Sequence, residues 1–291
     1  MFKRDWVVGV LLASPLALVC CAHEAGDEGE HDDEYAVAWR SVEQLVDGEV
    51  IARKYVVHTP LDWDSSVELP LIFAFHGGGG EGDFFVEDLQ ESMHYNPFIG
   101  IYPNAVEDGW NIGLASDGPD DVALVLSILD DLEGTAGMDT SHPVALGYSR
   151  GAAFVHTLAT ATDRFAGIGA MASQLRTAHQ PQPEGAQVSV LQLHGTEDNV
   201  IEYEGTGEGE AEGEAFLGAE QSAAVWAAHN GCADTATEIA SGAYMRMEWE
   251  QCDAGTQVVH YRLDGVGHDM PWDVEDDTFA TIVNFLLDTR R

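Results

Sequence analysis

One serine stands in a setting that suits it for nucleophilic chemistry. The segment GYSRG at residues 147–151 has the G-x-S-x-G pattern, and it lies between an apolar run at residues 143–148 and a predicted helix that begins near Gly151. On such a strand-to-helix turn the hydroxyl projects above the edge of a sheet, and the flanking glycines let neighbouring elements approach without a Cβ clash. Ser149 is therefore the candidate nucleophile.

A base and an acid for this serine follow later in the chain. A serine hydroxyl is a weak nucleophile near neutral pH, so it needs a histidine as base and a carboxylate that orients the histidine. Asp198 lies in the segment HGTED just after an apolar run at residues 188–193, and His268 lies in GVGHD just after a predicted strand at residues 257–263. Catalytic groups gather at such strand ends in open α/β sheets. We predict that Ser149, Asp198 and His268 act together.

Four other ionisable residues offer alternatives for these roles. Glu197 and Asp269 adjoin the predicted acid and base, but in a tight turn the adjacent side chain points elsewhere. His76 and His194 each end a predicted strand just before a glycine, which favours a structural hydrogen-bonding role that shapes the loop.

The same chemistry needs hydrogen-bond donors for the oxyanion of a tetrahedral intermediate. The run HGGGG at residues 76–80 follows an apolar run at residues 69–75 and leaves backbone NH groups unobstructed. We predict one donor at Gly78 and a second at the backbone NH of Arg150, the residue after the nucleophile. The run lacks the Gly-Lys-Ser/Thr ending of a phosphate-binding loop and the spacing of a dinucleotide fingerprint. The predicted chemistry requires no cofactor, and no metal site is predicted.

The elements that must position these residues follow from the hydrophobic pattern. Apolar runs without polar alternation, typical of strands buried on both faces, occur at residues 69–75, 98–102, 143–148, 165–170 and 188–193. Helical patterns occur at residues 120–133, 151–160, 219–230 and 274–287. Ahead of them, residues 40–45 and 49–58 flank Asp47-Gly48, a signal for a tight hairpin. The sequence predicts an α/β fold with a mostly parallel sheet, helices on both faces and an amino-terminal β-hairpin.

Acidic residues dominate the charge of the chain. Its 291 residues are 45% hydrophobic, which is enough for one sizeable core, and they include 51 Asp and Glu against 12 Lys and Arg, a formal net charge of −39. Such a surface repels phosphate backbones and anionic headgroups, which excludes nucleic-acid binding. Lysine occurs only as Lys3 and Lys54. This scarcity indicates adaptation to high salt, with an acidic secreted protein as the alternative.

The amino terminus has the features of an export signal. Lys3 and Arg4 precede an apolar run at residues 7–19 that is too short to span a bilayer. The following LVCC resembles the lipobox of bacterial lipoproteins, with Cys21 as the lipidated residue. Cleavage after Ala22 is the alternative, because a lipobox usually has Gly, Ala or Ser before the modified cysteine. We expect an exported protein that is either a cell-envelope lipoprotein or freely secreted, with membrane contact only through a lipid anchor.

Three regions are predicted along the chain. Residues 1–21 form the export signal, and residues 22–34 form a disordered acidic tether because they hold seven carboxylates and no apolar residue larger than Ala. Residues 35–291 form one domain. Within it, the Gly- and Glu-rich residues 205–214 are predicted to form a surface loop, with a calcium site or a lid as alternatives.

Taken in order, these motifs resemble the family of secreted esterases that groups feruloyl and acetylxylan esterases with poly(3-hydroxybutyrate) depolymerases. The resemblance spans about residues 48–285. Besides the serine elbow it rests on HGGGG at 76–80, YPN at 102–104, WN at 110–111, DDV at 120–122, HGTED at 194–198, VWA and NGC within 225–232 and GHDMPW at 267–272. It implies the α/β-hydrolase fold and gives Ser149, Asp198 and His268 the same roles. The elbow departs from the family, which often has Ser-Asn-Gly-Gly, so Arg150 has either a protein carboxylate or an acidic substrate as its expected partner.

The cysteines beyond the signal form an even pair. Disulfides persist in exported proteins, so we predict a bond between Cys232 and Cys252. The resemblance implies cysteines around an extra hairpin ahead of the catalytic histidine, which suits a bridge that closes residues 237–251.

The resemblance implies hydrolysis of a carboxylic ester through an acyl-serine intermediate. The expected substrate is a phenolic or acetyl ester on a polysaccharide, or a hydroxyalkanoate oligomer. Trp110 and Trp272 are candidates to line the acyl or sugar pocket, with simple packing as the alternative. The competing hypotheses are a serine peptidase of the same fold and a non-catalytic surface protein that uses the scaffold for binding.

Overall fold

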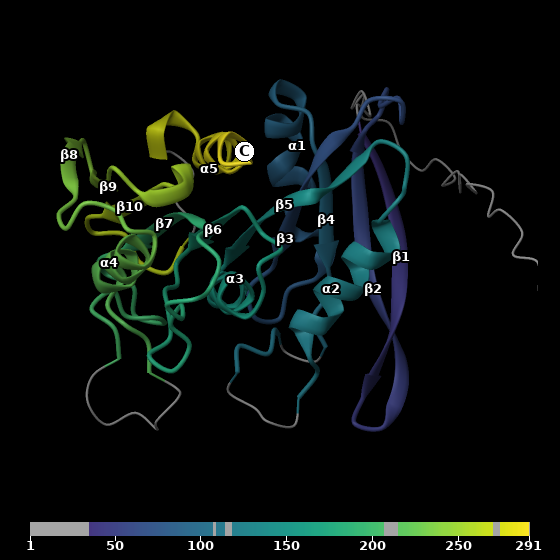
Figure 1. Ribbon diagram of the computed structural model, residues 1–291, viewed down its shortest axis with the longest axis horizontal. Coiled ribbons are helices and arrows are strands. Elements are labelled where there is room, and N and C mark those ends of the chain that lie inside the picture. Colours follow the sequence, from purple (N-terminus) through teal and green to yellow (C-terminus); the bar gives the residue numbers. More distant parts are fainter. Residues whose placement is uncertain (1–34, 107–108, 114–117, 207–214, 270–273, 291) are drawn as a thin grey trace, which may run out of the picture. The chain divides into compact units, whose positions relative to one another are not determined.

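A single ten-stranded sheet organises the chain (Figure 1). The computed structural model describes residues 35–290 apart from 107–108, 114–117, 207–214 and 270–273, so the predicted signal and tether lie outside the described residues. The strand order is β1-β2-β4-β3-β5-β6-β7-β10-β9-β8. The strands are β1 (Tyr35–Val46), β2 (Glu49–Pro60), β3 (Leu69–Phe75), β4 (Ile99–Pro103), β5 (Met138–Tyr148), β6 (Gly167–Met171), β7 (Ser189–Gly195), β8 (Thr237–Ser241), β9 (Tyr244–Trp249) and β10 (Val258–Leu263).

The middle of the sheet is parallel and its two ends are antiparallel. Strands β4, β3, β5, β6, β7 and β10 pair in parallel. The β1–β2 hairpin joins β4 antiparallel at one end, and the β8–β9 hairpin joins β10 antiparallel at the other. The predicted mostly parallel sheet with an amino-terminal hairpin is confirmed. Since parallel strands direct their carboxyl ends to one edge, the loops after β3, β5, β7 and β10 meet there.

Helices cover both faces of the sheet, as predicted. They are α1 (Val86–Tyr95), α2 (Asp121–Leu132), α3 (Arg150–Ala161), α4 (Ala219–His229) and α5 (Thr278–Asp288). The core on one face contains apolar residues of α2, α3 and α4, and the core on the other contains those of α1 and α5. In β3, Phe73 and Phe75 enter the first core while Ile72 and Ala74 enter the second. Burial on both faces explains why the apolar runs lack polar alternation.

Two helices differ from the sequence-based expectation. Helix α1 was not predicted, because its sequence VEDLQESMHY is mostly polar and buries only Leu89, Ser92 and Met93. Helix α5 begins at Thr278 and not at residue 274. The Asp277 side chain caps it by accepting a hydrogen bond from the Ala280 NH at 3.0 Å. A short 3₁₀ turn precedes this cap, with Glu275 at a φ of 52°.

Two hairpins extend the sheet, and their turns follow from local chemistry. Asp47 and Gly48 both have positive φ, 51° and 84°, as the Asp-Gly signal predicts for a two-residue hairpin turn. At the other end, the Cys232–Cys252 disulfide brackets the β8–β9 hairpin, so the predicted bridge is confirmed.

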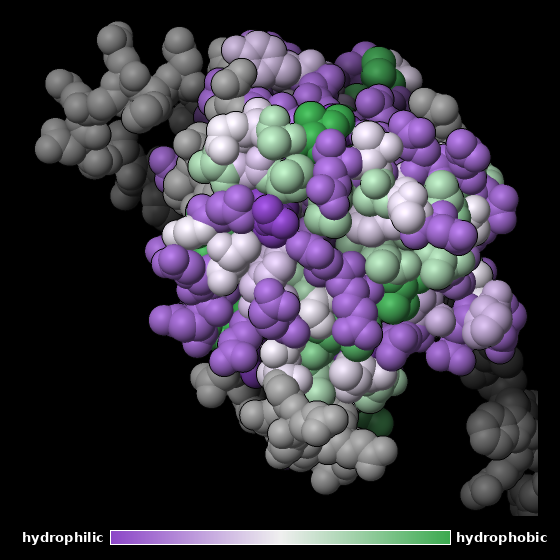
Figure 2. All heavy atoms as spheres, turned by 90° about the vertical axis from the view of Figure 1, so that its left-hand side faces the viewer, coloured by the Kyte–Doolittle hydropathy of each residue, from purple (hydrophilic) through white to green (hydrophobic). Residues whose placement is uncertain are grey.

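Figure 2 shows this end of the molecule, where hydrophilic side chains cover most of the described surface. None of the helices in the described residues combines the length and apolar character that a bilayer crossing requires.

The disulfide is expected to contribute to stability. It joins residues 20 positions apart, and closing a loop of that size restricts the unfolded chain. Replacing both Cys232 and Cys252 by serine should lower the free energy of unfolding by about 3 kcal/mol. Urea denaturation of the variant and the wild type under non-reducing conditions measures this change, and an unchanged midpoint would contradict it.

Buried histidines should make the fold sensitive to acid. Burial lowers the pKa of His58 to about 4 and the pKa values of His156 and His260 to about 3. In the unfolded chain these groups take up protons below about pH 6.5, before the folded chain does, so the free energy of unfolding falls as the pH falls.

The variant His156→Gln tests this, because glutamine can still accept the hydrogen bond that the Trp226 Nε1–H donates at 3.1 Å. Between pH 7 and pH 5 the variant should lose about 2 kcal/mol less unfolding free energy than the wild type loses. Urea denaturation at the two pH values measures it. The exposed His142→Gln is the control and should leave the loss unchanged. An equal loss in His156→Gln and wild type would refute the assignment.

Candidate active site

Ser149 occupies a sharp turn between β5 and α3. Its backbone has φ 54° and ψ −119°, a strained conformation for a residue with a side chain. The turn is fixed by the Ser149 NH, which donates to the Met171 carbonyl at 2.8 Å. A Cβ at Gly147 would clash with the Gly151 carbonyl, and a Cβ at Gly151 would clash with that of Phe75. Both glycines of the pattern are therefore required by close backbone approach.

The structure brings Ser149, His268 and Asp198 into one hydrogen-bonded chain. The Oγ of Ser149 lies 2.8 Å from Nε2 of His268, and Nδ1 of His268 lies 2.7 Å from Oδ2 of Asp198. Because the carboxylate accepts, Nδ1 carries the proton and donates, which leaves Nε2 free to accept the serine proton. Glu197 and Asp269, the alternative acids, are both exposed.

Four donors surround the Asp198 carboxylate. Oδ1 accepts from the NH groups of Val200 and Ile201, both at 2.9 Å, and Oδ2 accepts from His268 and from Nε2 of His194 at 3.1 Å. Burial by itself raises the pKa of this carboxyl, but the hydrogen bonds outweigh burial and hold the pKa well below its ordinary value. Asp198 therefore stays ionised beside His268.

His194 contributes more to the site than its predicted loop-shaping role. Its Nε2 also lies 2.9 Å from the Ile201 carbonyl, and two acceptors at one nitrogen require that the nitrogen carry the proton. The side chain is buried, and the Tyr203 ring packs against it edge-on with centroids 5.7 Å apart. Its predicted loop-shaping role extends to holding the carboxylate of Asp198. The H-G-x-x-D spacing contains that signal, because a tight turn places residues four apart in contact.

Tyr148 and Phe84 form an aromatic wall beside the histidine. The Tyr148 hydroxyl donates to the backbone carbonyl of His268 at 2.6 Å, and the two rings have centroids 5.6 Å apart. The half-exposed Phe84 stacks on Tyr148 at 6.4 Å. The sequence pattern does not point to these side chains, because the residue before the serine is variable in G-x-S-x-G.

The glycine loop after β3 lies directly against the nucleophile. A Cβ on Gly77 would lie 3.5 Å from the Cβ of Ser149. Within the described residues, neither the NH of Gly78 nor that of Arg150, the first residue of α3, donates a hydrogen bond. His76 shapes the loop: its Nε2 accepts from the Ala105 NH at 3.2 Å, and its Nδ1 donates to the Gly77 carbonyl at 2.8 Å.

Comparison with known proteins agrees with this geometry. No family model matches the chain. It is 27% identical over 236 residues to the probable feruloyl esterase C of Aspergillus niger, covering 76% of this chain and 78% of that protein. It is 22% identical over 239 residues to feruloyl esterase B of Piromyces equi, covering 76% of this chain but only 44% of that protein. The chain is an ester hydrolase. Its fold matches that of an acetyl xylan esterase from Aspergillus awamori with a TM-score of 0.55 at 16% identity, covering 79% of this chain and 94% of that one, so the α/β-hydrolase fold is confirmed.

In this esterase Trp110 is a core residue, so of its two predicted roles the structure supports packing and not the lining of a substrate pocket. The side chain is fully buried and packs edge-on against Phe75 and stacked on Phe154, with centroids 5.1 Å away in each case. Its Nε1–H donates to the His76 carbonyl at 2.9 Å. Trp110 therefore supports the glycine loop from below. Trp272 and Cys21 lie outside the described residues.

The Arg150 side chain of the esterase bonds to its own protein. Its Nε donates to the Trp110 carbonyl at 2.7 Å, so within the described residues a backbone oxygen takes the place of the protein carboxylate, which was one of its two expected partners.

A buried ion pair holds the segment after β4. Asp121 accepts from Arg53 at 2.7 Å and from the Asn111 NH at 2.6 Å, which ties that segment to α2 and β2.

No group of three or more His, Cys, Asp or Glu side chains in the described part of the chain could hold a metal ion.

Removing the charge of Asp198 should disable the esterase. The variant Asp198→Asn presents an amide to His268 and no longer fixes its tautomer, so kcat should fall by about 10⁴-fold. Steady-state hydrolysis of a p-nitrophenyl ester measures the change, and circular dichroism checks the fold. The exposed neighbour Glu197→Gln is the matched control and should keep wild-type kcat. A large loss of kcat in Glu197→Gln with kcat retained in Asp198→Asn would show that Glu197, and not Asp198, is the orienting carboxylate.

Proposed function

We propose that this esterase hydrolyses carboxylic esters through an acyl-serine intermediate, with Ser149 as nucleophile, His268 as general base and acid, and Asp198 as the orienting carboxylate. The observation that carries the proposal is the continuous chain of contacts, 2.8 Å from serine to histidine and 2.7 Å from histidine to aspartate. A protein that used the scaffold only for binding would have no need of this arrangement.

The residues act in two half-reactions. In the first, Oγ of Ser149 attacks the ester carbonyl carbon while Nε2 of His268 takes the hydroxyl proton. The oxyanion accepts hydrogen bonds from the NH groups of Gly78 and Arg150. The bond to the alcohol oxygen then breaks, and His268 gives its proton to the leaving alcohol. Throughout, the negative charge of Asp198 stabilises the imidazolium.

In the second half-reaction water replaces the alcohol. His268 removes a proton from the water, the resulting hydroxide attacks the acyl carbonyl, and the same two NH groups stabilise the new oxyanion. The bond to Oγ breaks and His268 returns the proton to Ser149, which releases the carboxylic acid. The chain's own residues supply every proton transfer.

The substrate class proposed is a phenolic or acetyl ester on a polysaccharide. The names of the relatives, feruloyl esterases and an acetyl xylan esterase, support it. The wall of Phe84 and Tyr148 beside His268 favours an aromatic acyl group, because a planar ring packs well against stacked aromatic side chains. Hydroxyalkanoate oligomers and peptides are the competing substrates.

The disulfide supports an exported location, since such bonds persist in oxidising compartments. We retain the proposal of an export signal that ends before a lipid-modified Cys21, with cleavage after Ala22 as the alternative. The intact mass and amino-terminal sequence of the mature protein separate the two: a diacylated Cys21 supports the anchor, and a free amino terminus at His23 refutes it.

A substrate panel tests the function. Acid release from methyl ferulate, acetylated xylan, hydroxybutyrate oligomers, a peptide amide and short p-nitrophenyl esters should show preference for the phenolic or acetyl esters. Ser149→Ala should lower the rate by at least about 10⁴-fold. Equal background rates for the wild type and Ser149→Ala, at both low and high salt, would refute an ester hydrolase that uses Ser149.

A further inference from the structure

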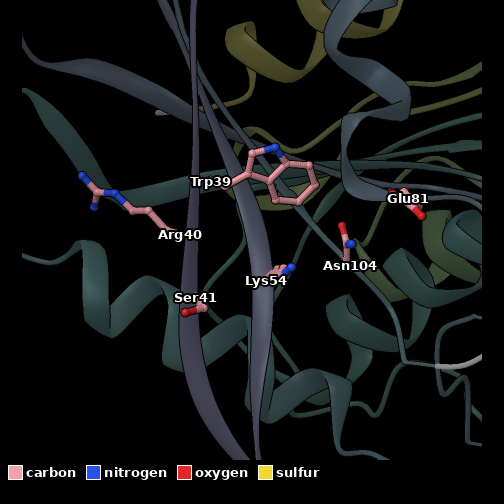
Figure 3. Close-up of a pocket in the computed structure, with 6 residues that line it drawn as sticks. All are labelled: Trp39, Arg40, Ser41, Lys54, Glu81 and Asn104. Carbon is pink, nitrogen blue, oxygen red and sulfur yellow. The ribbon is translucent and has the colours of Figure 1, made fainter. Parts of the chain in front are cut away.

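A recess beside the glycine loop is lined by side chains that the reaction does not use. It has a volume of about 380 Å³ and is lined by Trp39, Arg40, Ser41, Lys54, Glu81 and Asn104. Figure 3 shows the indole of Trp39 directed toward Asn104 and Glu81, while the guanidinium of Arg40 points away from it. Ser41 pairs with Lys54 across the hairpin, and alternation along β1 puts Trp39 on the same face as Ser41.

Trp39 is opposite Val56 across the hairpin, but much of its indole stays outside the core. Its side chain is 48% exposed, and it is the one exposed tryptophan among those that the structure describes. It belongs to neither hydrophobic core. An indole that stays in water beside a recess offers a flat apolar surface to a ligand.

The polar groups around the indole include both donors and acceptors. Lys54 is exposed and forms no salt bridge with any described residue. Asn104 uses its Oδ1 to accept from the Gly82 NH at 2.7 Å, and its Nδ2 donates to no described residue. Glu81 supplies a carboxylate. The hydroxyl groups of a sugar require such a mixture, while its C–H face requires an apolar plane.

The charges in the recess favour an uncharged sugar. Lys54 and Glu81 carry opposite charges, and the guanidinium of the third charged residue, Arg40, points away from the indole, so the recess has at most one net positive charge. The chain as a whole has a formal net charge of −39, which disfavours an anionic glycan.

The recess lies on the same edge of the sheet as the reacting serine. The backbone carbonyl of Lys54 in β2 accepts a hydrogen bond from the NH of Asn104, the residue that follows β4. Glu81 belongs to the loop that also contains Gly78. Between Lys54 and Ser149 the sheet order β2-β4-β3-β5 gives three strand spacings, about 15 Å. A short oligosaccharide spans that distance.

The geometry assigns the recess as a glycan subsite: Trp39 stacks on one uncharged sugar ring of the polysaccharide that carries the ester, and Lys54, Glu81 and Asn104 bind its hydroxyl groups. This inference rests on the proposed function and places part of the substrate. Trp39 then promotes the hydrolysis of esters carried on glycans and has no effect on the hydrolysis of esters of small alcohols.

The variant Trp39→Ala tests the subsite by substrate comparison. Its kcat/KM for a feruloylated or acetylated xylo-oligosaccharide should fall about tenfold, while kcat/KM for methyl ferulate and p-nitrophenyl acetate should stay within about twofold of wild type. Tyr95→Ala, at a 71% exposed aromatic on α1, is the control and should change neither. An equal effect of Trp39→Ala on both substrate types, or no effect on either, would overturn the subsite.

A binding experiment separates this inference from the proposed function, because it needs no catalysis. Ser149→Ala should bind an ester-free xylo-oligosaccharide in calorimetric titration, and the double variant Ser149→Ala/Trp39→Ala should bind it about tenfold more weakly. Equal affinity in the two proteins, or binding only of a uronic-acid-substituted oligosaccharide, would refute the subsite for an uncharged sugar. Failure of the wild type to hydrolyse any ester would instead refute the proposed function.

Discussion

The carboxylate of Asp198 is the interaction on which the rest of the site depends. It accepts hydrogen bonds from the backbone after β7, from His194 at the end of β7 and from His268 after β10. One buried anion thus fixes its own loop, the tautomer of His268 and the distance between two strand ends. Its low pKa follows from those donors, and the ionised form is the form that the proposed chemistry requires.

Close backbone approach brings the remaining strand ends to the same place. Gly147 and Gly151 let β5, α3 and β3 touch at the elbow, and Gly195 lets the end of β7 meet the segment before His268. The glycine loop after β3 then rests on the elbow through Gly77 and on Trp110 from below. The strained backbone of Ser149 is tolerated because the elements packed around the turn hold it in that conformation.

The sequence supports prediction of the features that depend on local chemistry. Buried strands have unbroken apolar runs, the Asp-Gly turn has positive φ at both residues, and the G-x-S-x-G glycines mark close contacts. Features set by tertiary contacts were harder to predict. Helix α1 buries too few apolar residues to show a clear period. The residue type of Trp110 leaves both a pocket lining and simple packing open, and only its burial decides for packing. His194, Phe84 and Tyr148 acquire their positions only when separate strand ends meet.

The measurement that tests the central claim most directly is covalent labelling of the folded protein with a fluorophosphonate, read out by intact mass and peptide mapping. An activated serine hydroxyl attacks phosphorus, and the reaction needs no knowledge of the natural substrate. The account predicts one adduct per chain, located on Ser149 and absent from a folded Ser149→Ala protein. No adduct on the folded wild type, or an adduct on another residue, would contradict it.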